Sequence, residues 1–334
     1  MFHRQSQCFE PPHARQDELA KIEAHFEQIF TVSNEKLRRV TDQFVGVLCK
    51  GLEKEGEVVP MLPTYVFGWP TGEETGKYLS LDMGGTNLRV CLVELLGKGK
   101  FELTQSKFRI TDEQKHEDGA KLFDFCARCI KDFIETHFGS CDHLDEHLSL
   151  GFTFSYPTVQ RAIDHGELIR WTKGFDNPNT EGRDCADMLR TSLKRFNVPV
   201  KLSSIINDTT GTLIASNYVD PRTKIACIFG TGCNAAYMES IGNIPKLSNL
   251  DLPADEQMVI NCEYGAFDSF EHRYLGSLRS KYDVEIDLSS NKPNQQAFEK
   301  MIAGKYLGEI YRLVLCELVY DGVLFLGQET YKIE

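Results

Sequence analysis

One segment of the chain combines a carboxylate, two glycines and a threonine between two apolar runs. It extends from Leu79 to Val93 and reads Leu-Ser-Leu-Asp-Met-Gly-Gly-Thr-Asn-Leu-Arg-Val-Cys-Leu-Val. Apolar runs bounded by glycine are typical of two strands joined by a tight turn. Because glycine has no side chain, Gly84 and Gly85 would let backbone N–H groups approach an anion, and Asp82 could hold a hydrated metal ion beside it. The segment predicts a phosphate-binding hairpin, with an ordinary glycine turn as the alternative.

Further polar residues come directly after apolar runs that have the composition of strands. Together with the hairpin carboxylate they are Asp82, Ser155, Asp208, Thr231 and Glu263. Open α/β sheets place ligands at the ends of their strands, so we expect these side chains to lie near one another. Asp208 is the candidate general base, because a carboxylate can accept the proton of a hydroxyl that attacks a phosphoryl group. The alternative for Asp208 is a helix N-cap, and both roles can hold together.

A second glycine turn, Gly230-Thr231-Gly232, follows the predicted strand 225–229. Its N–H groups and its hydroxyl could face one anion, and two such turns would suit a nucleotide with several phosphates. The chain has no Walker A sequence, since Gly76-Lys77 is followed by tyrosine and has no glycine five residues upstream. The dinucleotide fingerprint G-x-G-x-x-G is also absent, which argues against a Rossmann dehydrogenase.

Glu309 falls within a predicted helix over 296–320, in line with Ile302, Tyr306, Leu313 and Cys316. A carboxylate on an apolar stripe is costly unless it is paired or bound to a ligand. Either Glu309 bonds a buried polar partner, or it faces a cleft that holds a hydroxyl-rich molecule. In the second case the donors and acceptors suited to a polyol would also include Ser155, Thr172, Lys173, Asn207, Asn234 and Glu263.

The elements that must position these residues follow from the apolar periodicity. It predicts a helix from Asp17 onward and a second after Ser33 that ends at Gly51 or Gly56. It also predicts helices near 121–138 and 184–196, and strands at 148–154, 200–206, 225–229 and 258–262. The segment 60–76, rich in proline and glycine, is predicted to be an extended connector. Cys126 and Cys129 share the apolar face of the third helix, so a core role is favoured over a redox or metal pair. For His137, His143, His147 and Cys141 a solvated turn is favoured over a zinc site.

Length and composition indicate a globular protein of two domains. The chain has 334 residues, 41% of them hydrophobic and 26% charged, which exceeds the usual size of a single core. A net charge of −12 disfavours nucleic acid and anionic membranes as partners. Eleven scattered cysteines, an odd number, indicate reduced thiols and a cytoplasmic location. The sequence shows neither a secretory signal nor a run of 18 apolar residues.

Taken together, these motifs resemble the hexokinase family, most closely the fungal-type enzymes. The matching segments are Leu-Asp-Met-Gly-Gly-Thr-Asn-Leu-Arg at 81–89, Phe-Thr-Phe-Ser-Tyr-Pro at 152–157, Trp-Thr-Lys-Gly-Phe at 171–175, Ile-Asn-Asp-Thr-Thr-Gly-Thr at 206–212, Gly-Thr-Gly-Cys-Asn-Ala-Ala-Tyr at 230–237, Asn-Cys-Glu-Tyr-Gly-Ala-Phe at 261–267 and Tyr-Leu-Gly-Glu at 306–309. They span residues 17–334 in the order of the family.

The resemblance implies an α/β, actin-like (ribonuclease-H-like) ATPase fold with two domains around a cleft. It also implies an ATP- and Mg²⁺-dependent phosphotransferase that acts on the 6-hydroxyl of glucose or a related hexose, a reaction at the entry to glycolysis. The resemblance further implies that Asp208 is the catalytic base and that Lys173 contacts the sugar and helps to stabilise charge. The other implied sugar ligands are Ser155, Thr172, Asn207, Asn234, Glu263 and Glu309. The residues that would bind the ATP phosphates are Asp82, Gly84, Gly85, Thr86, Asn87, Arg89, Thr209, Gly230, Thr231 and Gly232. Mg²⁺ would have no direct protein ligand and would be held by ATP and by waters near Asp82 and Asp208.

The chain departs from the family pattern at its C-terminal end, because the family usually continues well beyond Glu334. The part not present would carry the adenosine-binding loop and the final helices of the larger domain. We therefore expect a loose tail at 1–16, an incomplete larger domain formed by 17–76 with 209–334, and a smaller domain at 77–208. The alternative to a hexokinase is a truncated, non-catalytic sugar-binding or regulatory protein of the same family.

Overall fold

The computed structural model describes residues 13–139, 148–325 and 329. The chain divides into two compact units. One unit is Gly46–Phe267, and the other joins Met1–Val45 with Asp268–Glu334. The residues predicted to carry the chemistry lie in the first unit, with the exception of Glu309.

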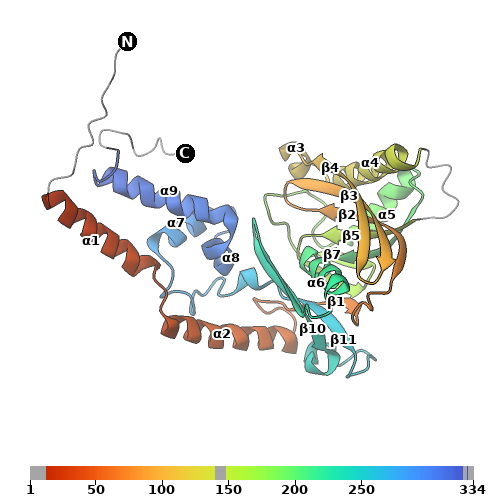
Figure 1. The fold of residues 1–334 in the computed structure, drawn as a ribbon, viewed down its shortest axis with the longest axis horizontal. Coiled ribbons are helices and arrows are strands. Elements are labelled where there is room, and N and C mark those ends of the chain that lie inside the picture. The colour runs from red at the N-terminus through yellow and green to blue at the C-terminus, as the bar shows by residue number, and fades with distance from the viewer. Residues whose placement is uncertain (1–12, 140–147, 326–328, 330–334) are drawn as a thin grey trace, which may run out of the picture. The chain divides into compact units, whose positions relative to one another are not determined.

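The first unit contains a five-stranded mixed sheet (Figure 1). In spatial order its strands are β4 (Lys100–Arg109), β3 (Asn87–Gly97), β2 (Thr75–Met83), β5 (Leu148–Phe154) and β8 (Val200–Ile206). β4, β3 and β2 are antiparallel neighbours, whereas β2, β5 and β8 run parallel. The carboxyl ends of β2, β5 and β8 therefore lie at one edge of the sheet, which brings the residues after these strands together.

The helices α4 (Gly119–Phe138) and α5 (Cys185–Arg195) supply their apolar faces to the core of this sheet. Both begin at an aspartate N-cap, Asp118 and Asp184. The short helix α3 (Asp112–His116) precedes α4 and is closed by a capping box at Thr111. Cys126 and Cys129 are buried in the α4 face as free thiols, so the core interpretation is confirmed.

The predicted hairpin is confirmed as β2 and β3, with Asp82 directly opposite Arg89 in the register. Further along the chain, β6 (Thr158–Ala162) and β7 (His165–Leu168) form a small antiparallel pair. The loop that follows is fixed by aromatic packing: Trp171 stacks on Phe175, and Tyr156 meets both rings edge to face. This packing holds the backbone on either side of Thr172 and Lys173.

A second, four-stranded antiparallel sheet belongs to the same unit. Its order is β1 (Leu62–Phe67), β11 (Gln257–Asn261), β10 (Cys233–Ser240) and β9 (Ile225–Phe229). The prediction of an extended connector over 60–76 is wrong in part, because β1 pairs with β11, and Thr75 and Gly76 already belong to β2. Such pairing depends on a partner almost two hundred positions away, which the local sequence does not reveal.

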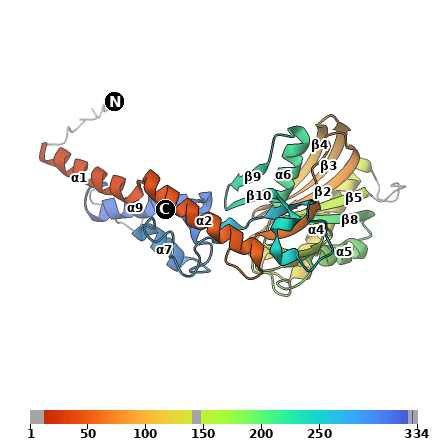
Figure 2. The same ribbon diagram turned by 90° about the horizontal axis from the view of Figure 1, so that it is seen from below.

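The helix α6 (Asp208–Val219) packs against the four-stranded sheet, as Figure 2 shows beside β9 and β10. Its residue Leu213 shares a small buried cluster with Ala226, Ala236 and Val259. The described residues of this unit also include the short 3₁₀ helices η2 (Ile241–Asn243), η3 (Pro245–Leu247) and η4 (Tyr264–Ala266).

The other unit is helical, with α1 (His13–Phe30), the first part of α2 (Asn34–Glu53), α7 (Lys281–Ser289), α8 (Ala297–Ile302) and α9 (Gly304–Tyr320). The predicted helix over 296–320 is interrupted, because Ala303 has an extended backbone (φ −81°, ψ 148°) and begins α9. Ser33 accepts a bond from Lys36 N at 3.2 Å at the start of α2.

His143, His147 and Cys141 lie outside the described residues, whereas His137 packs against Phe133 within α4. Among the residues that the structure describes, no helix has the length and apolar character needed to cross a membrane.

Candidate functional site

Asp208 is the first residue of α6, and the residue before it caps the helix. The Asn207 side-chain oxygen accepts a hydrogen bond from Thr209 N at 2.9 Å, with φ −69° and ψ 151° at Asn207. The N-cap alternative considered for Asp208 is therefore wrong: Asn207 has this role, although Asp208 Oδ1 also accepts from Thr209 N at 2.9 Å. Thr209 itself is fully buried. The carboxylate of Asp208 remains partly exposed at the positive end of a helix dipole.

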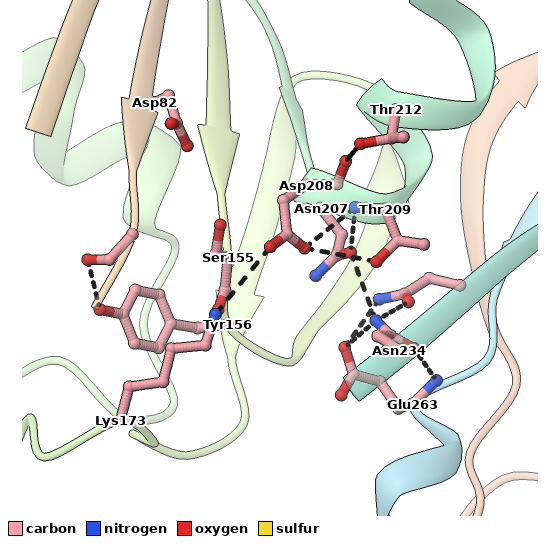
Figure 3. Close-up of polar contacts among 12 residues, drawn as sticks. Asp82, Ser155, Tyr156, Lys173, Asn207, Asp208, Thr209, Thr212, Asn234 and Glu263 are labelled. Carbon is pink, nitrogen blue, oxygen red and sulfur yellow. Dashed lines mark hydrogen bonds and ion pairs between the residues drawn. The ribbon is translucent and has the colours of Figure 1, made fainter. Parts of the chain in front are cut away.

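Lys173 reaches Asp208 from a loop on the other side of the site (Figure 3). Its Nζ donates to the Ser155 carbonyl at 2.7 Å and lies 4.0 Å from Asp208 Oδ2. It also lies 5.4 Å from the centre of the Tyr156 ring. The backbone of Lys173 has a left-handed conformation, with φ 57°. A non-glycine residue in this region is strained, which is common at ligand-binding positions.

Asp82 and Arg89 form a cross-strand ion pair, with 2.7 Å between Oδ2 and Nη1. Burial raises the pKa of Asp82; the hydrogen bond and charge of Arg89 oppose this rise, and the charge of Asp208 adds to it. Asp82 in β2 and Asp208 at the start of α6 thus act on each other electrostatically. Two such carboxylates form an environment suited to a cation.

Each of the two glycine turns contains a backbone hydrogen bond from its first glycine. Gly84 N donates to the Asn87 carbonyl at 3.1 Å, and Gly230 N donates to the Gly232 carbonyl at 2.9 Å. The Thr86 carbonyl accepts from Ile110 N at 3.0 Å, while Thr231 is exposed at the turn between β9 and β10. The first glycine of each turn thus gives its N–H to the turn itself.

A buried cluster of amides and a carboxylate lies at the ends of β10 and β11. Asn234 Nδ2 donates to Asn261 Oδ1 at 2.7 Å and to Glu263 Oε1 at 3.1 Å. Asn261 Nδ2 donates to the same Glu263 oxygen at 3.0 Å. A longer contact of 3.4 Å connects Asn234 Nδ2 with Asn207 Oδ1, which links the cluster to the start of α6. Glu263 has a left-handed backbone, φ 54°, that turns its side chain back toward the strand ends.

The structure thus brings most of the predicted residues into one region (Figure 3). Ser155 and Lys173 lie on one side of Asp208, and Asn234 and Glu263 lie on the other. Thr172 lies next to Lys173, and its carbonyl accepts from Phe175 N at 3.1 Å. Sequence reasoning missed Asn261 and the role of Tyr156, whose hydroxyl donates to the Gly84 carbonyl at 3.1 Å. A polar residue at the end of the apolar run Met-Val-Ile could have indicated Asn261.

Glu309 lies in the other unit and has a local partner. Its two carboxylate oxygens accept from Arg312 Nε at 2.7 Å and Nη2 at 2.6 Å. These bonds hold the pKa of Glu309 below its usual range. The side chain is 43% exposed, so the cost expected for a carboxylate buried on an apolar stripe does not arise, and its partner Arg312 is itself only partly buried. Its role as a sugar ligand stays a prediction.

Within the described ranges, no group of three or more His, Cys, Asp or Glu side chains is arranged to hold a metal ion. Asp82 and Asp208 could instead accept hydrogen bonds from waters bound to a cation.

Fold and site together define an α/β protein with the actin-like ATPase fold. Two hexokinase family models match the chain, one over residues 22–218 and one over residues 224–334. The chain belongs to the hexokinase family.

Among the relatives, the hexokinase of Emericella nidulans is 51% identical over 92% of this chain. Hexokinase-1 of Schizosaccharomyces pombe is 50% identical over 95% of it. The solved structure of a Schistosoma mansoni hexokinase complexed with glucose matches with a TM-score of 0.85 at 35% identity, covering 94% of this chain and 69% of that one. The chain spans 63% of the length of the first of these relatives and 64% of the second.

Proposed function

We propose that this protein transfers the γ-phosphate of ATP to the 6-hydroxyl of a hexose, with Asp208 as general base. The observation that carries the proposal is the position of the Asp208 carboxylate, 4.0 Å from Lys173 Nζ and beside the buried cluster of Asn234, Asn261 and Glu263. Hydroxyl-rich ligands need such a mixture of donors and acceptors, and phosphoryl transfer needs a carboxylate at the attacking hydroxyl. The glucose in the Schistosoma mansoni structure supports a hexose as the ligand.

In this mechanism Asp208 orients the 6-hydroxyl and accepts its proton as the oxygen attacks phosphorus. Lys173 is held by Ser155 and by the Tyr156 ring, so its ammonium is fixed near the reacting oxygen, where it can stabilise negative charge. Ser155, Thr172, Asn207, Asn234 and Glu263 would hold the other hydroxyls.

The phosphates would lie between the two glycine turns. Since Gly84 and Gly230 use their N–H groups within the turns, the neighbouring N–H groups and the Thr86 and Thr231 hydroxyls would meet the anion. The carboxylates of Asp82 and Asp208 lie in the same region (Figure 3), and carboxylate oxygens suit the waters of a divalent cation. Mg²⁺, when bound to ATP, would neutralise phosphate charge, and Asp82 and Asp208 would orient its waters. Arg89 would keep Asp82 in place.

The wider context of this activity is part of the same proposal. A net charge of −12 and described cysteines that form no disulfide are compatible with a small-molecule substrate, no nucleic acid or membrane partner, and a cytoplasmic location. Fructose and mannose are further candidate substrates beside glucose. The division into a larger and a smaller domain stays a prediction.

The test is Asp208→Asn in the full chain, with Asp220→Asn as a matched control at the other end of α6. Because Asp208 would be the base, we expect glucose-dependent ADP formation to fall by about 10²–10⁴-fold. Glucose binding, followed by the fluorescence of Trp171, should change much less. Asp220 pairs with Arg222 at the surface, so its replacement should leave both measurements unchanged.

Unchanged turnover in Asp208→Asn would contradict the assignment of the base. Glucose binding by the unaltered chain without ADP formation would favour a sugar-binding protein over a kinase.

A further inference from the structure

The residue that joins the members of the amide–carboxylate cluster is Asn261, at the last position of β11. Its side chain is buried, with 3% of the residue exposed. Asn261 Oδ1 accepts from Asn234 Nδ2 at 2.7 Å, and Asn261 Nδ2 donates to Glu263 Oε1 at 3.0 Å. One amide thus bridges two predicted sugar ligands.

The orientation of the Asn234 amide is fixed by the backbone. Its Oδ1 accepts from Ala235 N at 2.7 Å and from Glu263 N at 2.9 Å, so Nδ2 must face the cluster. There, two N–H hydrogens meet three acceptors: Asn261 Oδ1 at 2.7 Å, Glu263 Oε1 at 3.1 Å and Asn207 Oδ1 at 3.4 Å. If Asn234 is to donate to a sugar hydroxyl, one of these bonds must be exchanged.

The two shorter bonds, to Asn261 and Glu263, take the two N–H hydrogens, and of these two the bond to Glu263 can be exchanged at the lower cost. It is longer than the bond to Asn261, and the same carboxylate oxygen keeps a second donor, Asn261 Nδ2. A buried carboxylate oxygen that lost both of these donors would bear a desolvation cost. Asn261 therefore allows Asn234 to release Glu263.

We infer that Asn261 is a positioning residue for hexose binding, which holds the Glu263 carboxylate while Asn234 turns an N–H toward a sugar hydroxyl. This inference rests on the proposed function, since it assumes that a hexose occupies the site. It assigns to Asn261 no direct contact with the sugar and no part in the proton transfer.

The test is Asn261→Asp, which keeps the shape of the side chain and replaces the donor by an acceptor. Two carboxylates about 3 Å apart strongly disfavour double ionisation, so the new aspartate and Glu263 would share a proton at low pH and repel each other at high pH, where both are ionised. We expect the dissociation constant for glucose, measured by calorimetry, to rise at least about 30-fold at pH 8. The increase should shrink as the pH falls to 5.5, because the shared proton restores a donor.

Asn217→Asp is the matched control. Asn217 is equally buried, at 3% exposed, and its Nδ2 donates to the Pro221 and Thr223 carbonyls in the same unit. Its replacement should leave the pH dependence of glucose affinity as in the wild type. A purely structural effect of a new buried carboxylate would appear equally in both variants.

The doubly substituted N261D/E263Q chain exchanges the amide and the carboxylate, and so restores one donor and one acceptor. Its thermal unfolding midpoint should lose the pH dependence of N261D, with or without sugar. If N261D does not fold, folding of the exchanged variant at pH 8 supports the inference, and failure of both to fold overturns it.

Glucose affinity of N261D that is pH-independent, or equal to that of Asn217→Asp, also overturns the inference. Absence of glucose binding by the wild type would instead overturn the proposed function, and the inference with it.

Discussion

At the scale of single residues, Gly85 makes room for the Lys173 side chain. A Cβ atom at Gly85 would lie 3.2 Å from Lys173 Cβ and 3.4 Å from Lys173 Cδ. The backbone of Gly85 does not have a positive φ. The glycine is therefore needed for close approach to the lysine and not for an unusual backbone conformation.

Replacing Gly85 with alanine should displace Lys173 by a few tenths of an ångström. We expect kcat/KM for glucose to fall about tenfold, or about 1.4 kcal/mol in transition-state stabilisation, with little change in thermal stability. Gly46→Ala in α2 is the control, since a Cβ there has nothing within 4 Å and alanine favours a helix. Equal activity in both variants, measured by ADP formation, would mean that the lysine adapts without cost.

At the scale of elements, Lys246 in η3 holds the end of α2 against the start of β1. Its Nζ donates to the carbonyls of Gly51 at 2.6 Å, Pro60 at 2.7 Å and Met61 at 2.6 Å. Burial lowers the pKa of Lys246 from 10.5 to about 8, and the charge of Glu55 opposes this only in part. The folded protein therefore releases this proton at a lower pH than the unfolded chain does.

Between pH 8 and 10.5 the unfolded chain binds more protons at Lys246 than the native state. The free energy of unfolding of the unaltered chain should then rise with pH relative to that of Lys246→Met. The slope of this difference should be at most about 1.4 kcal/mol per pH unit. Urea unfolding of both proteins from pH 7.5 to 10 measures the difference between their free energies of unfolding. The contributions of all other titrating groups cancel in this difference. Parallel curves for the two proteins would contradict the lowered pKa.

At the scale of the whole molecule, the helical unit has its own buried charge cluster. Asp287 Oδ1 accepts from Lys300 Nζ at 2.6 Å, and Asp287 Oδ2 from Arg279 Nη2 at 3.1 Å. Burial would raise the pKa of Asp287, but the bonds to Lys300 and Asn294 and the charges of Lys300 and Arg279 outweigh it and lower the pKa. The cluster connects α7, α8 and the segment before α7.

Replacing Lys300 with methionine should destabilise this unit by about 3 kcal/mol, because it leaves part of a buried charge uncompensated. Amide hydrogen exchange should accelerate in residues 13–45 and 268–325 and much less in 46–267. Lys281→Met removes the exposed pair with Glu317 and should cost less than about 1 kcal/mol. Faster exchange throughout the chain would show that the two units unfold together.

The sequence by itself determined the parts of this protein that depend on local patterns. Apolar residues around Gly84 and Gly85 specify the β2–β3 hairpin, and Ser155 and Asp208 follow strands as expected, whereas Asp82 lies within β2, one residue before its end. These features need only the strand period and the conformational freedom of glycine. The resemblance to the hexokinase family could also be inferred from the sequence, because the motifs that carry it are short and contiguous.

Only the tertiary structure decided which distant groups meet. It paired β1 with β11, placed Lys173 beside Asp208 and joined Asn234 to Asn261 and Glu263. It also ended a helix at Ala303, although the apolar period continues through that residue. Pairing and hydrogen bonding across long stretches of chain depend on the partner as well as the residue, so neither local propensity nor periodicity contains them.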